Sequence, residues 1–312
     1  MKGTAAIRSG GAPPARVSES IESRENRWLK RFRAALSGDS PARGESDEIV
    51  GVEGSRLVEA ALRSGVEVLA VLFSDAGAKH LSSLAPQIPS GARLLRTNDR
   101  LFASATGTET PQGIAALVRP RAAQFDDLVG GVPLVLVLAG VQDPGNVGTL
   151  VRTAEAFGAS GIAACAAGAI GTANPFAPKA LRASAGSALR LPILRGISAP
   201  VLLAQLRVAG VRTYAACPEQ DSIGGSGGSA KEAFAPWQLD WRAPVALLVG
   251  NEGAGLPAEL VRSADVVVRI PQALRGRNEA AREADSSAES LNAAVAGSIL
   301  LYEAARQRGL AL

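Results

Sequence analysis

The segment "PLVLVLAGVQDPGNVGTLVRTAEAFG" (133–158) decides the fold of this chain. It opens on a continuous apolar run, 133–140, of the kind expected for a strand buried on both faces of a sheet. A glycine-containing turn follows, and then a helical segment at 146–158. Strands that alternate with helices in this way indicate an α/β protein with a parallel sheet.

The same alternation continues to the end of the chain, so residues 133–312 are predicted to form one α/β domain with helices on both faces of the sheet. The loop 217–234 interrupts the pattern and is expected to be flexible from its composition. The predicted strands lie at 161–167, 189–194, 211–217, 244–250 and 264–270. The predicted helices lie at 175–185, 198–209, 256–263 and 289–309.

A smaller α/β unit is predicted upstream, over residues 24–120. Residues 121–132 break its pattern and indicate a linker. Residues 1–23 lack the apolar centre of a secretory signal, and their alanine, glycine and proline content predicts a disordered tail. No apolar run reaches the length of a membrane span, so a cytoplasmic protein is the expectation.

The composition excludes several kinds of chemistry. His80 is the only histidine, and it lies outside every glycine-rich motif, so a Ser-His-Asp triad near those motifs is excluded. With Cys165 and Cys217 as the only cysteines, a zinc site is improbable, and no metal is expected. The net charge of +4 is compatible with a polyanionic partner.

The first predicted helix carries a cluster of cations. Glu25 is the only acid among Arg24, Arg27, Lys30, Arg31 and Arg33. Such a cluster is typical either of a solvated helix face or of a nucleic-acid contact, and the two interpretations are about equally favoured. Arg27, Lys30 and Arg31 are the candidate RNA contacts.

The turn at 140–145 fails two tests for nucleotide-phosphate binding. Gly140 and Gly145 have P-loop spacing, but Asn146 and Val147 stand where a P-loop has lysine and a hydroxyl residue, so an NTPase is not expected. A dinucleotide-binding site is not expected either, because the glycine spacing is wrong and strand 161–167 ends without an acid.

Three segments follow strands at the carboxyl edge of the predicted sheet, where α/β proteins place their catalytic and ligand-binding residues. In the first, Asn146 either caps a helix or binds a hydroxyl, and Arg152 is either solvated or holds a phosphate. In the second, "GNEGAG" (250–255), Glu252 is either a turn residue or a carboxylate that faces a ligand cleft. The third is "RIPQ" (269–272).

Two polar residues open the predicted terminal helix. Ser290 is typical of an N-terminal helix position, whereas Asn292 has no obvious structural need there.

Taken in order, these segments resemble a known family. "DPGNVGTLVRTAEAFGA" (143–159), "LLVGNEGAGLP" (247–257) and "RIPQ" with "ESLNAAVAGSILLYE" (289–303) resemble the three motifs of the SpoU (TrmH-type) RNA ribose 2′-O-methyltransferases of the SPOUT superfamily. Upstream, "GVEGSRLVEAALRSGVEVLAVLFSD" (51–75) and "TGTETPQGIAALV" (106–118) resemble the family's N-terminal RNA-binding domain. The resemblance covers roughly residues 24–309.

The resemblance implies a SPOUT methyltransferase domain at 133–312, whose parallel sheet ends in a C-terminal trefoil knot, preceded by a substrate RNA-binding domain at 24–120. It also implies a homodimer with an active site near the dimer interface, and S-adenosylmethionine as the cofactor. The implied cofactor-binding residues are Gly250, Asn251, Gly253, Ile270, Gln272 and Leu291. The implied catalytic residues are Asn146, Arg152, Glu252, Ser290 and Asn292.

The chain departs from the family at two places. Gln272 stands where the family usually has methionine, which changes the polarity of the cofactor pocket. A polar segment at 273–288 separates "RIPQ" from "ESLN", where the family has only a few residues. We expect this insertion to be neutral or mobile.

The implied reaction needs neither histidine nor metal, because the methyl group of the cofactor is already activated on a sulfonium. Arg152 is a poor base, since a guanidinium keeps its proton throughout the physiological pH range, so we expect it to hold a phosphate. Asn146 and Asn292 would orient the ribose hydroxyl, with Glu252 as an orienting group or a proton acceptor.

Ribosomal RNA is favoured as the substrate because of the additional N-terminal domain. Transfer RNA methylation, or an RNA-binding assembly factor without catalytic activity, are the alternatives.

Overall fold

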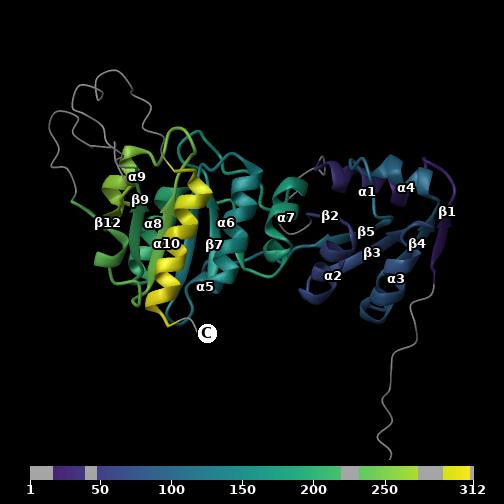
Figure 1. Ribbon diagram of the computed structural model, residues 1–312, viewed down its shortest axis with the longest axis horizontal. Helices are drawn as coiled ribbons and strands as arrows, with labels where there is room; N and C mark the ends of the chain where they lie inside the picture. The colour runs from purple at the N-terminus through teal and green to yellow at the C-terminus, as the bar shows by residue number, and fades with distance from the viewer. Residues whose placement is uncertain (1–16, 39–47, 219–231, 273–290, 310–312) are drawn as a thin grey trace, which may run out of the picture. The chain divides into compact units, whose positions relative to one another are not determined.

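The computed structural model describes residues 17–38, 48–218, 232–272 and 291–309. The chain divides into two compact units, Met1–Pro120 and Arg121–Leu312 (Figure 1).

The first unit is a five-stranded sheet in the order β1-β4-β3-β5-β2. The strands β1, β4 and β3 are parallel to one another, and β5 is antiparallel to both of its neighbours, β3 and β2. Helices α1 and α4 cover one face and α2 and α3 the other (Figure 1). The strands are β1 (Glu19–Ile21), β2 (Val50–Glu53), β3 (Glu67–Phe73), β4 (Arg93–Thr97) and β5 (Ile114–Arg119). The helices are α1 (Arg27–Ser37), α2 (Ser55–Arg63), α3 (Ala78–Leu84) and α4 (Asp99–Ala105).

Strand β1 corrects the expectation of a disordered tail over 1–23, although residues 1–16 lie outside the described part of the chain. Ile21 is 1% exposed, and its carbonyl accepts a hydrogen bond from Thr97 Oγ1 at 3.0 Å. A three-residue strand has too little pattern to be recognised locally, because its pairing with β4 comes from residues more than 70 positions away.

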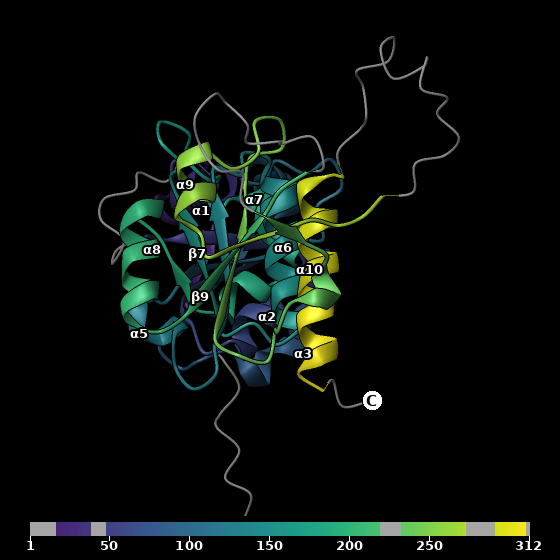
Figure 2. The same cartoon turned by 90° about the vertical axis from the view of Figure 1, so that its left-hand side faces the viewer.

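The second unit is a seven-stranded sheet in the order β10-β12-β9-β11-β6-β7-β8, and every pairing is parallel, so the predicted parallel sheet is confirmed. Helices α5, α8 and α9 lie on one face, and α6, α7 and α10 on the other (Figure 2). The strands are β6 (Leu134–Ala139), β7 (Gly161–Cys165), β8 (Ile193–Leu194), β9 (Arg212–Ala216), β10 (Ala233–Phe234), β11 (Val245–Val249) and β12 (Val266–Val268). The helices are α5 (Phe125–Leu128), α6 (Pro144–Ala156), α7 (Pro178–Ser184), α8 (Ala199–Val208), α9 (Ala258–Ser263) and α10 (Ala293–Gln307).

Two segments of this unit differ from the sequence-based prediction. The predicted linker 121–132 contains α5, whose Leu128 is fully buried in the core, so this segment belongs to the second unit. The predicted flexible loop 217–234 ends in β10, which pairs with β12, while residues 219–231 lie outside the described part.

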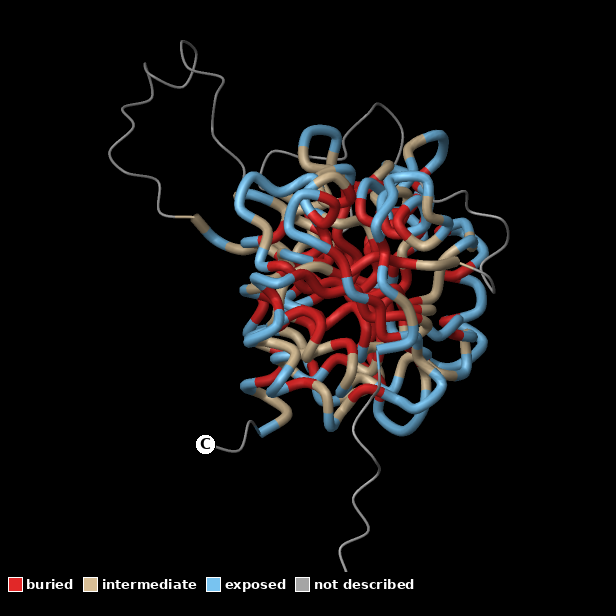
Figure 3. Tube along the Cα trace, turned by 90° about the vertical axis from the view of Figure 1, so that its right-hand side faces the viewer, coloured by how far each residue is buried: buried red, intermediate tan, exposed pale blue. Residues whose placement is uncertain are grey.

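The core of the second unit follows from its sequence. Every residue of β6 and β11 is buried, because helices cover both faces of the sheet (Figure 3 shows buried residues in red). Among the helices that the structure describes, none combines the length and the apolarity needed to cross a bilayer.

Small residues bring α7 and α10 close to α6. A Cβ atom added to Gly148 of α6 would lie 2.3 Å from the carbonyl oxygen of Ala180 in α7. A Cβ atom added to Gly297 of α10 would lie 2.4 Å from a methyl group of Leu150 in α6. The close packing of these helices positions the first residues of α6 and α10 next to each other.

The opposite end of α10 is fixed by Arg308. Its guanidinium donates to four backbone carbonyls, those of Val132, Pro133, Trp241 and Ala243, at 2.7–2.9 Å. These carbonyls precede β6 and β11. The four hydrogen bonds hold the C-terminal end of α10, and a hydrogen bond from Asn292 to Asn146 holds its N-terminal end.

Candidate active site

The candidate site lies at the carboxyl ends of β6, β11 and β12. The turn 250–255 after β11 is built around Asn251. Asn251 and Gly255 exchange two backbone hydrogen bonds of 3.0 Å, and Asn251 Oδ1 accepts from the N–H groups of Gly253 and Ala254 at 2.9 Å. Asn251 Nδ2 donates to the carbonyl of Gly140 at 3.0 Å, which joins this turn to the loop after β6.

Gly250 permits the chain to double back in this turn. A Cβ atom at Gly250 would lie 2.5 Å from the backbone nitrogen of Leu256, a distance that no other residue type could accept without movement of the backbone.

Glu252 makes the second connection between the two loops. Its carboxylate accepts hydrogen bonds from the backbone N–H groups of Gln142 and Asp143, both at 3.1 Å, and from Asn146 Nδ2 at 3.0 Å. Burial raises the pKa of Glu252, but these hydrogen bonds outweigh it, and the resulting pKa is lower than that of an ordinary glutamate. The carboxylate is therefore ionised at neutral pH, and it is better suited to hold Asn146 than to accept a proton.

Asn146 links Glu252 to Asn292. Asn146 Oδ1 accepts from Asn292 Nδ2 at 3.1 Å, so the three side chains form a continuous hydrogen-bonded chain, Asn292–Asn146–Glu252. Asn146 does not cap α6, because Asp143 does so: Asp143 Oδ1 accepts from the N–H of Asn146 at 2.9 Å. Of the two interpretations of Asn146, the capping one is therefore wrong.

Asn292 has a structural role that the sequence did not reveal. It is the N-cap of α10, and its Oδ1 accepts from the N–H groups of Ala294 and Val295 at 2.8 and 3.2 Å. The oxygen of this carboxamide therefore caps the start of α10, and its nitrogen donates a hydrogen bond to Asn146. The asparagine at a helix start was the available signal, and the helix was predicted to begin too early, at 289.

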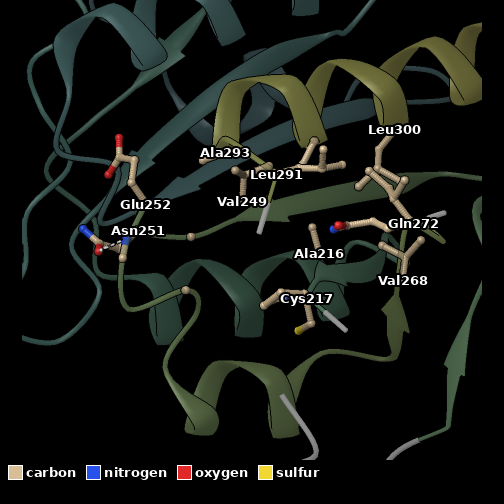
Figure 4. Close-up of a pocket in the computed structure, with 16 residues that line it drawn as sticks. Ala216, Cys217, Val249, Asn251, Glu252, Val268, Gln272, Leu291, Ala293 and Leu300 are labelled. Atoms are coloured by element: carbon tan, nitrogen blue, oxygen red, sulfur yellow. Dashed lines mark hydrogen bonds between the residues drawn. The ribbon is translucent and has the colours of Figure 1, made fainter. Parts of the chain in front are cut away.

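A pocket adjoins this hydrogen-bonded chain (Figure 4). Glu252 and Asn251 lie at one end of it, and Gln272 lies at the other, beside Ala216 and Val268. All six residues for which the sequence predicted cofactor binding line this pocket: Gly250, Asn251, Gly253, Ile270, Gln272 and Leu291.

The pocket also has a wall that the sequence analysis missed. Ala216 ends β9, and Cys217 and Pro218 follow it, at the same edge of the sheet as the ends of β11 and β12. The rule that ligands bind beyond the carboxyl ends of strands applied to β9 too, but the composition of its loop was interpreted only as a sign of flexibility, so the first residues of that loop were not considered.

Other predicted site residues do not join this cluster. Arg152 is exposed on α6 and makes no hydrogen bond or ion pair within the described part of the chain. It follows Asn146 by six residues, which places it about 9 Å further along the helix and about 240° around it. Ser290 and the insertion 273–288 lie outside the described residues.

The cations of α1 lie exposed on the first unit. The guanidinium groups of Arg27 and Arg31 stack over the ring of Trp28, at 5.8 and 4.9 Å from its centroid, and Lys30 forms an ion pair with Glu25 at 2.5 Å. Within the described ranges, no group of three or more His, Cys, Asp or Glu side chains is arranged to hold a metal ion.

Comparison with known proteins decides the family. The family model described as "SpoU rRNA Methylase family" matches residues 133–302, more than half of the 312-residue chain. The chain belongs to the SpoU rRNA methylase family. A second family model, the MRM3-like substrate binding domain, matches residues 42–116. The family predicted from the three motifs is therefore confirmed.

Individual SpoU proteins are similar over most of their length. A 23S rRNA guanosine 2′-O-methyltransferase, RlmP of Bacillus subtilis, is 34% identical over 252 residues, which cover 80% of this chain and 86% of RlmP. The crystal structure of an AdoMet-bound rRNA methyltransferase from Sinorhizobium meliloti superposes with a TM-score of 0.72 at 29% identity, covering 92% of this chain and 97% of that one. The SpoU methyltransferase AviRb from Streptomyces viridochromogenes, in complex with AdoMet, gives a TM-score of 0.71 at 27% identity, covering 91% and 98%.

We predict that Glu252→Gln destabilises the protein at neutral pH, and that the difference from wild type shrinks in acid. The pKa of Glu252 is lowered in the folded state, so its contribution is fully present above the ordinary value of 4.5 and is lost as the pH falls through the lower folded value. We expect a loss of about 1 kcal/mol at pH 7, since the carboxamide can accept with only one oxygen. Thermal unfolding of both proteins between pH 7 and about pH 3 measures this, and a difference that stays constant or grows below pH 4.5 would contradict it.

Proposed function

We propose that this protein uses S-adenosylmethionine to methylate a ribose 2′-hydroxyl in ribosomal RNA, in the cytoplasm. The observation that carries the proposal is the hydrogen-bonded chain Asn292–Asn146–Glu252, whose Glu252 lies at one end of the pocket. Relatives named as 23S rRNA guanosine 2′-O-methyltransferases, RlmP and RlmB, favour ribosomal over transfer RNA.

The pocket fits the proposed cofactor. The end of the pocket away from Glu252 has apolar walls at Ala216, Val268 and Leu300, which suit a flat base. The turn at Gly250 and Gly253 brings backbone polar groups to the pocket where side chains would fill it. Gly250, Asn251, Gly253, Ile270, Gln272 and Leu291 would hold the cofactor, which, when bound, supplies a methyl group already activated on a sulfonium.

With the methyl group activated, the chain's own residues need mainly to orient the hydroxyl. Asn146 and Asn292 each use one hydrogen of the amide nitrogen within the chain of hydrogen bonds, which leaves a second hydrogen on each to donate to the ribose oxygen. Glu252 fixes the orientation of the Asn146 carboxamide and is, in this proposal, a positioning residue. Its lowered pKa and its three donors speak against a role as proton acceptor.

We predict that the purified protein transfers labelled methyl groups from S-adenosylmethionine to ribosomal RNA and not to transfer RNA. Asn146→Ala should lower kcat by about 100-fold or more, because the hydroxyl loses its orientation. Mapping of 2′-O-methyl sites on ribosomal RNA from cells with and without the gene identifies the nucleotide. Labelling of transfer RNA alone would show that transfer RNA, and not ribosomal RNA, is the substrate. An absence of S-adenosylmethionine binding in calorimetry would favour an assembly factor without catalytic activity.

Arg152 is proposed to hold a phosphate next to the target ribose. Its guanidinium is exposed and unpaired within the described residues, and such a group binds phosphate in a bidentate manner. Ser290, which opens the same motif as Asn292, is proposed to contribute to the site as well, and Arg27, Lys30 and Arg31 are proposed to contact RNA from the first unit.

We predict that Arg152→Lys keeps part of the RNA affinity and of the turnover, whereas Arg152→Ala loses about 1–3 kcal/mol of RNA binding, because the charge-assisted contact is lost. Filter binding at a fixed salt concentration and single-turnover kinetics measure the two effects. Near-normal RNA binding by Arg152→Lys together with abolished turnover would favour a role as base over anchoring.

We propose that the protein is a homodimer in which the two copies contact each other through α10. Val295, Ile299 and Tyr302 are 49%, 39% and 51% exposed and lie on one face of this helix. The ring of Phe157 from α6 packs edge-on against Tyr302, with 5.6 Å between the ring centroids, and extends this apolar stripe. Large apolar side chains gathered on one exposed face are typical of an interface.

We predict that Ile299→Glu, which buries a charge in the proposed interface, shifts the protein to a monomer in sedimentation velocity. The control is Val208→Glu on α8, on the opposite face of the sheet, where Val208 is 91% exposed. A monomeric wild type, or an equal response to the two substitutions, would contradict the proposed interface.

The C-terminal trefoil knot is also a proposal. It is supported by the position of β11 between β9 and β6, and by the return of the chain after β12 to pack α10 against α6. Experimental density that traces residues 273–290 would test it.

A further inference from the structure

The pocket contains one carboxamide that the fold does not use. Three side chains with amide or carboxyl groups line it: Asn251, Glu252 and Gln272. The side chain of Asn251 bonds the N–H groups of its own turn and the carbonyl of Gly140. Glu252 bonds two backbone N–H groups and Asn146. Both are occupied in holding the loops together.

Gln272 differs from both. Its side chain is half-buried, and it makes no hydrogen bond with any other described residue. Figure 4 shows its carboxamide extending into the pocket beside Ala216, with Val268 and Leu300 close by. These neighbours offer only apolar atoms, so a carboxamide there has one donor group and one acceptor without a side-chain partner.

An unused carboxamide in an apolar pocket has an energetic cost. Covering the pocket with a ligand removes water from the amide, and the amide must then find a partner or lose its hydrogen bonds. A ligand that offers both a donor and an acceptor along one edge would satisfy Gln272, whereas a ligand with an apolar edge would leave it unsatisfied.

The rest of the site indicates which part of the cofactor reaches Gln272. The reacting group has to lie near Asn146 and Asn292, and Asn146 bonds to Glu252, which lies with Asn251 at one end of the pocket. The base of the cofactor would then lie at the opposite, apolar end of the pocket, where Gln272 lies. Adenine has flat apolar faces and, along its edge, an amino donor adjacent to a ring-nitrogen acceptor, and a glutamine carboxamide pairs with that edge through two hydrogen bonds.

We propose that Gln272 is a specificity-determining residue that recognises the adenine edge of the cofactor with its side-chain carboxamide. The inference rests on the proposed function, since it takes S-adenosylmethionine as the ligand. It assigns to this chain a side-chain contact with the base that methionine, with no donor and only a weak sulfur acceptor, could not make.

The test is a double-mutant cycle between the side chain and the ligand. The ligands are S-adenosylhomocysteine and its analogue with unsubstituted purine in place of adenine, which lacks the amino donor. The proteins are the full-length wild type and Gln272→Met, a substitution of similar length and volume. Calorimetry gives the four dissociation constants, and thermal unfolding confirms that the variant is folded.

We expect the wild type to bind the purine analogue about tenfold more weakly than S-adenosylhomocysteine, and Gln272→Met to discriminate by only about twofold. Gln272→Asn, whose carboxamide is one methylene shorter, should behave like Gln272→Met, and it serves as the second variant if the first does not fold. Equal discrimination by the wild type and the variants would overturn the inference.

The same measurements separate this inference from the proposed function. If the wild type binds neither S-adenosylmethionine nor S-adenosylhomocysteine, the proposed function fails. If the wild type binds both, but the amino group and Gln272 show no coupling, only the role of Gln272 fails.

Discussion

The ionised carboxylate of Glu252 is the interaction on which the site depends. It lies in the turn after β11 and accepts from two backbone N–H groups in the loop after β6, as well as from Asn146 at the start of α6. Because β6 and β11 are neighbours in the sheet, one carboxylate can hold both loops, and Asn292 then connects the start of α10 to the same chain. Three polar side chains thus fix the loop after β6, the turn after β11 and the start of α10, with Asn146 lying 106 residues before Glu252 and 146 before Asn292.

Much of the architecture could be predicted from the sequence, because strands such as 133–140 and 244–250 are buried on both faces and therefore appear as unbroken apolar runs. The short elements could not: β1 and β10 have three and two residues, and their pairing depends on strands distant in the chain. Helix α5 was taken for a linker because its four residues are too few to show a period, although Leu128 anchors it in the core.

The candidate site was predicted residue by residue, but the division of roles within it was not. Motif positions indicated that Asn146, Glu252 and Asn292 belong together. Asp143 directly before Pro144, and Asn292 near a helix start, are residue types typical of caps, but the cap is identified only when the first helical turn is known. Asn251 was predicted to line the pocket, and it does so while it braces its own turn, a role set by backbone geometry.

These contacts leave the described site without a free cation next to Asn146 and Asn292. Asn146, Glu252 and Asn292 are hydrogen-bonded to one another, and Arg152 is on another face of α6. A phosphate bound there would therefore have to approach from the exposed side of α6, beside the apolar stripe that begins at Val295, only three residues after Asn292. A second copy docked on that stripe would border the site without passing through the pocket. In the proposed dimer, RNA and cofactor would thus reach the asparagines from different sides, with Glu252 holding the two loops that separate them.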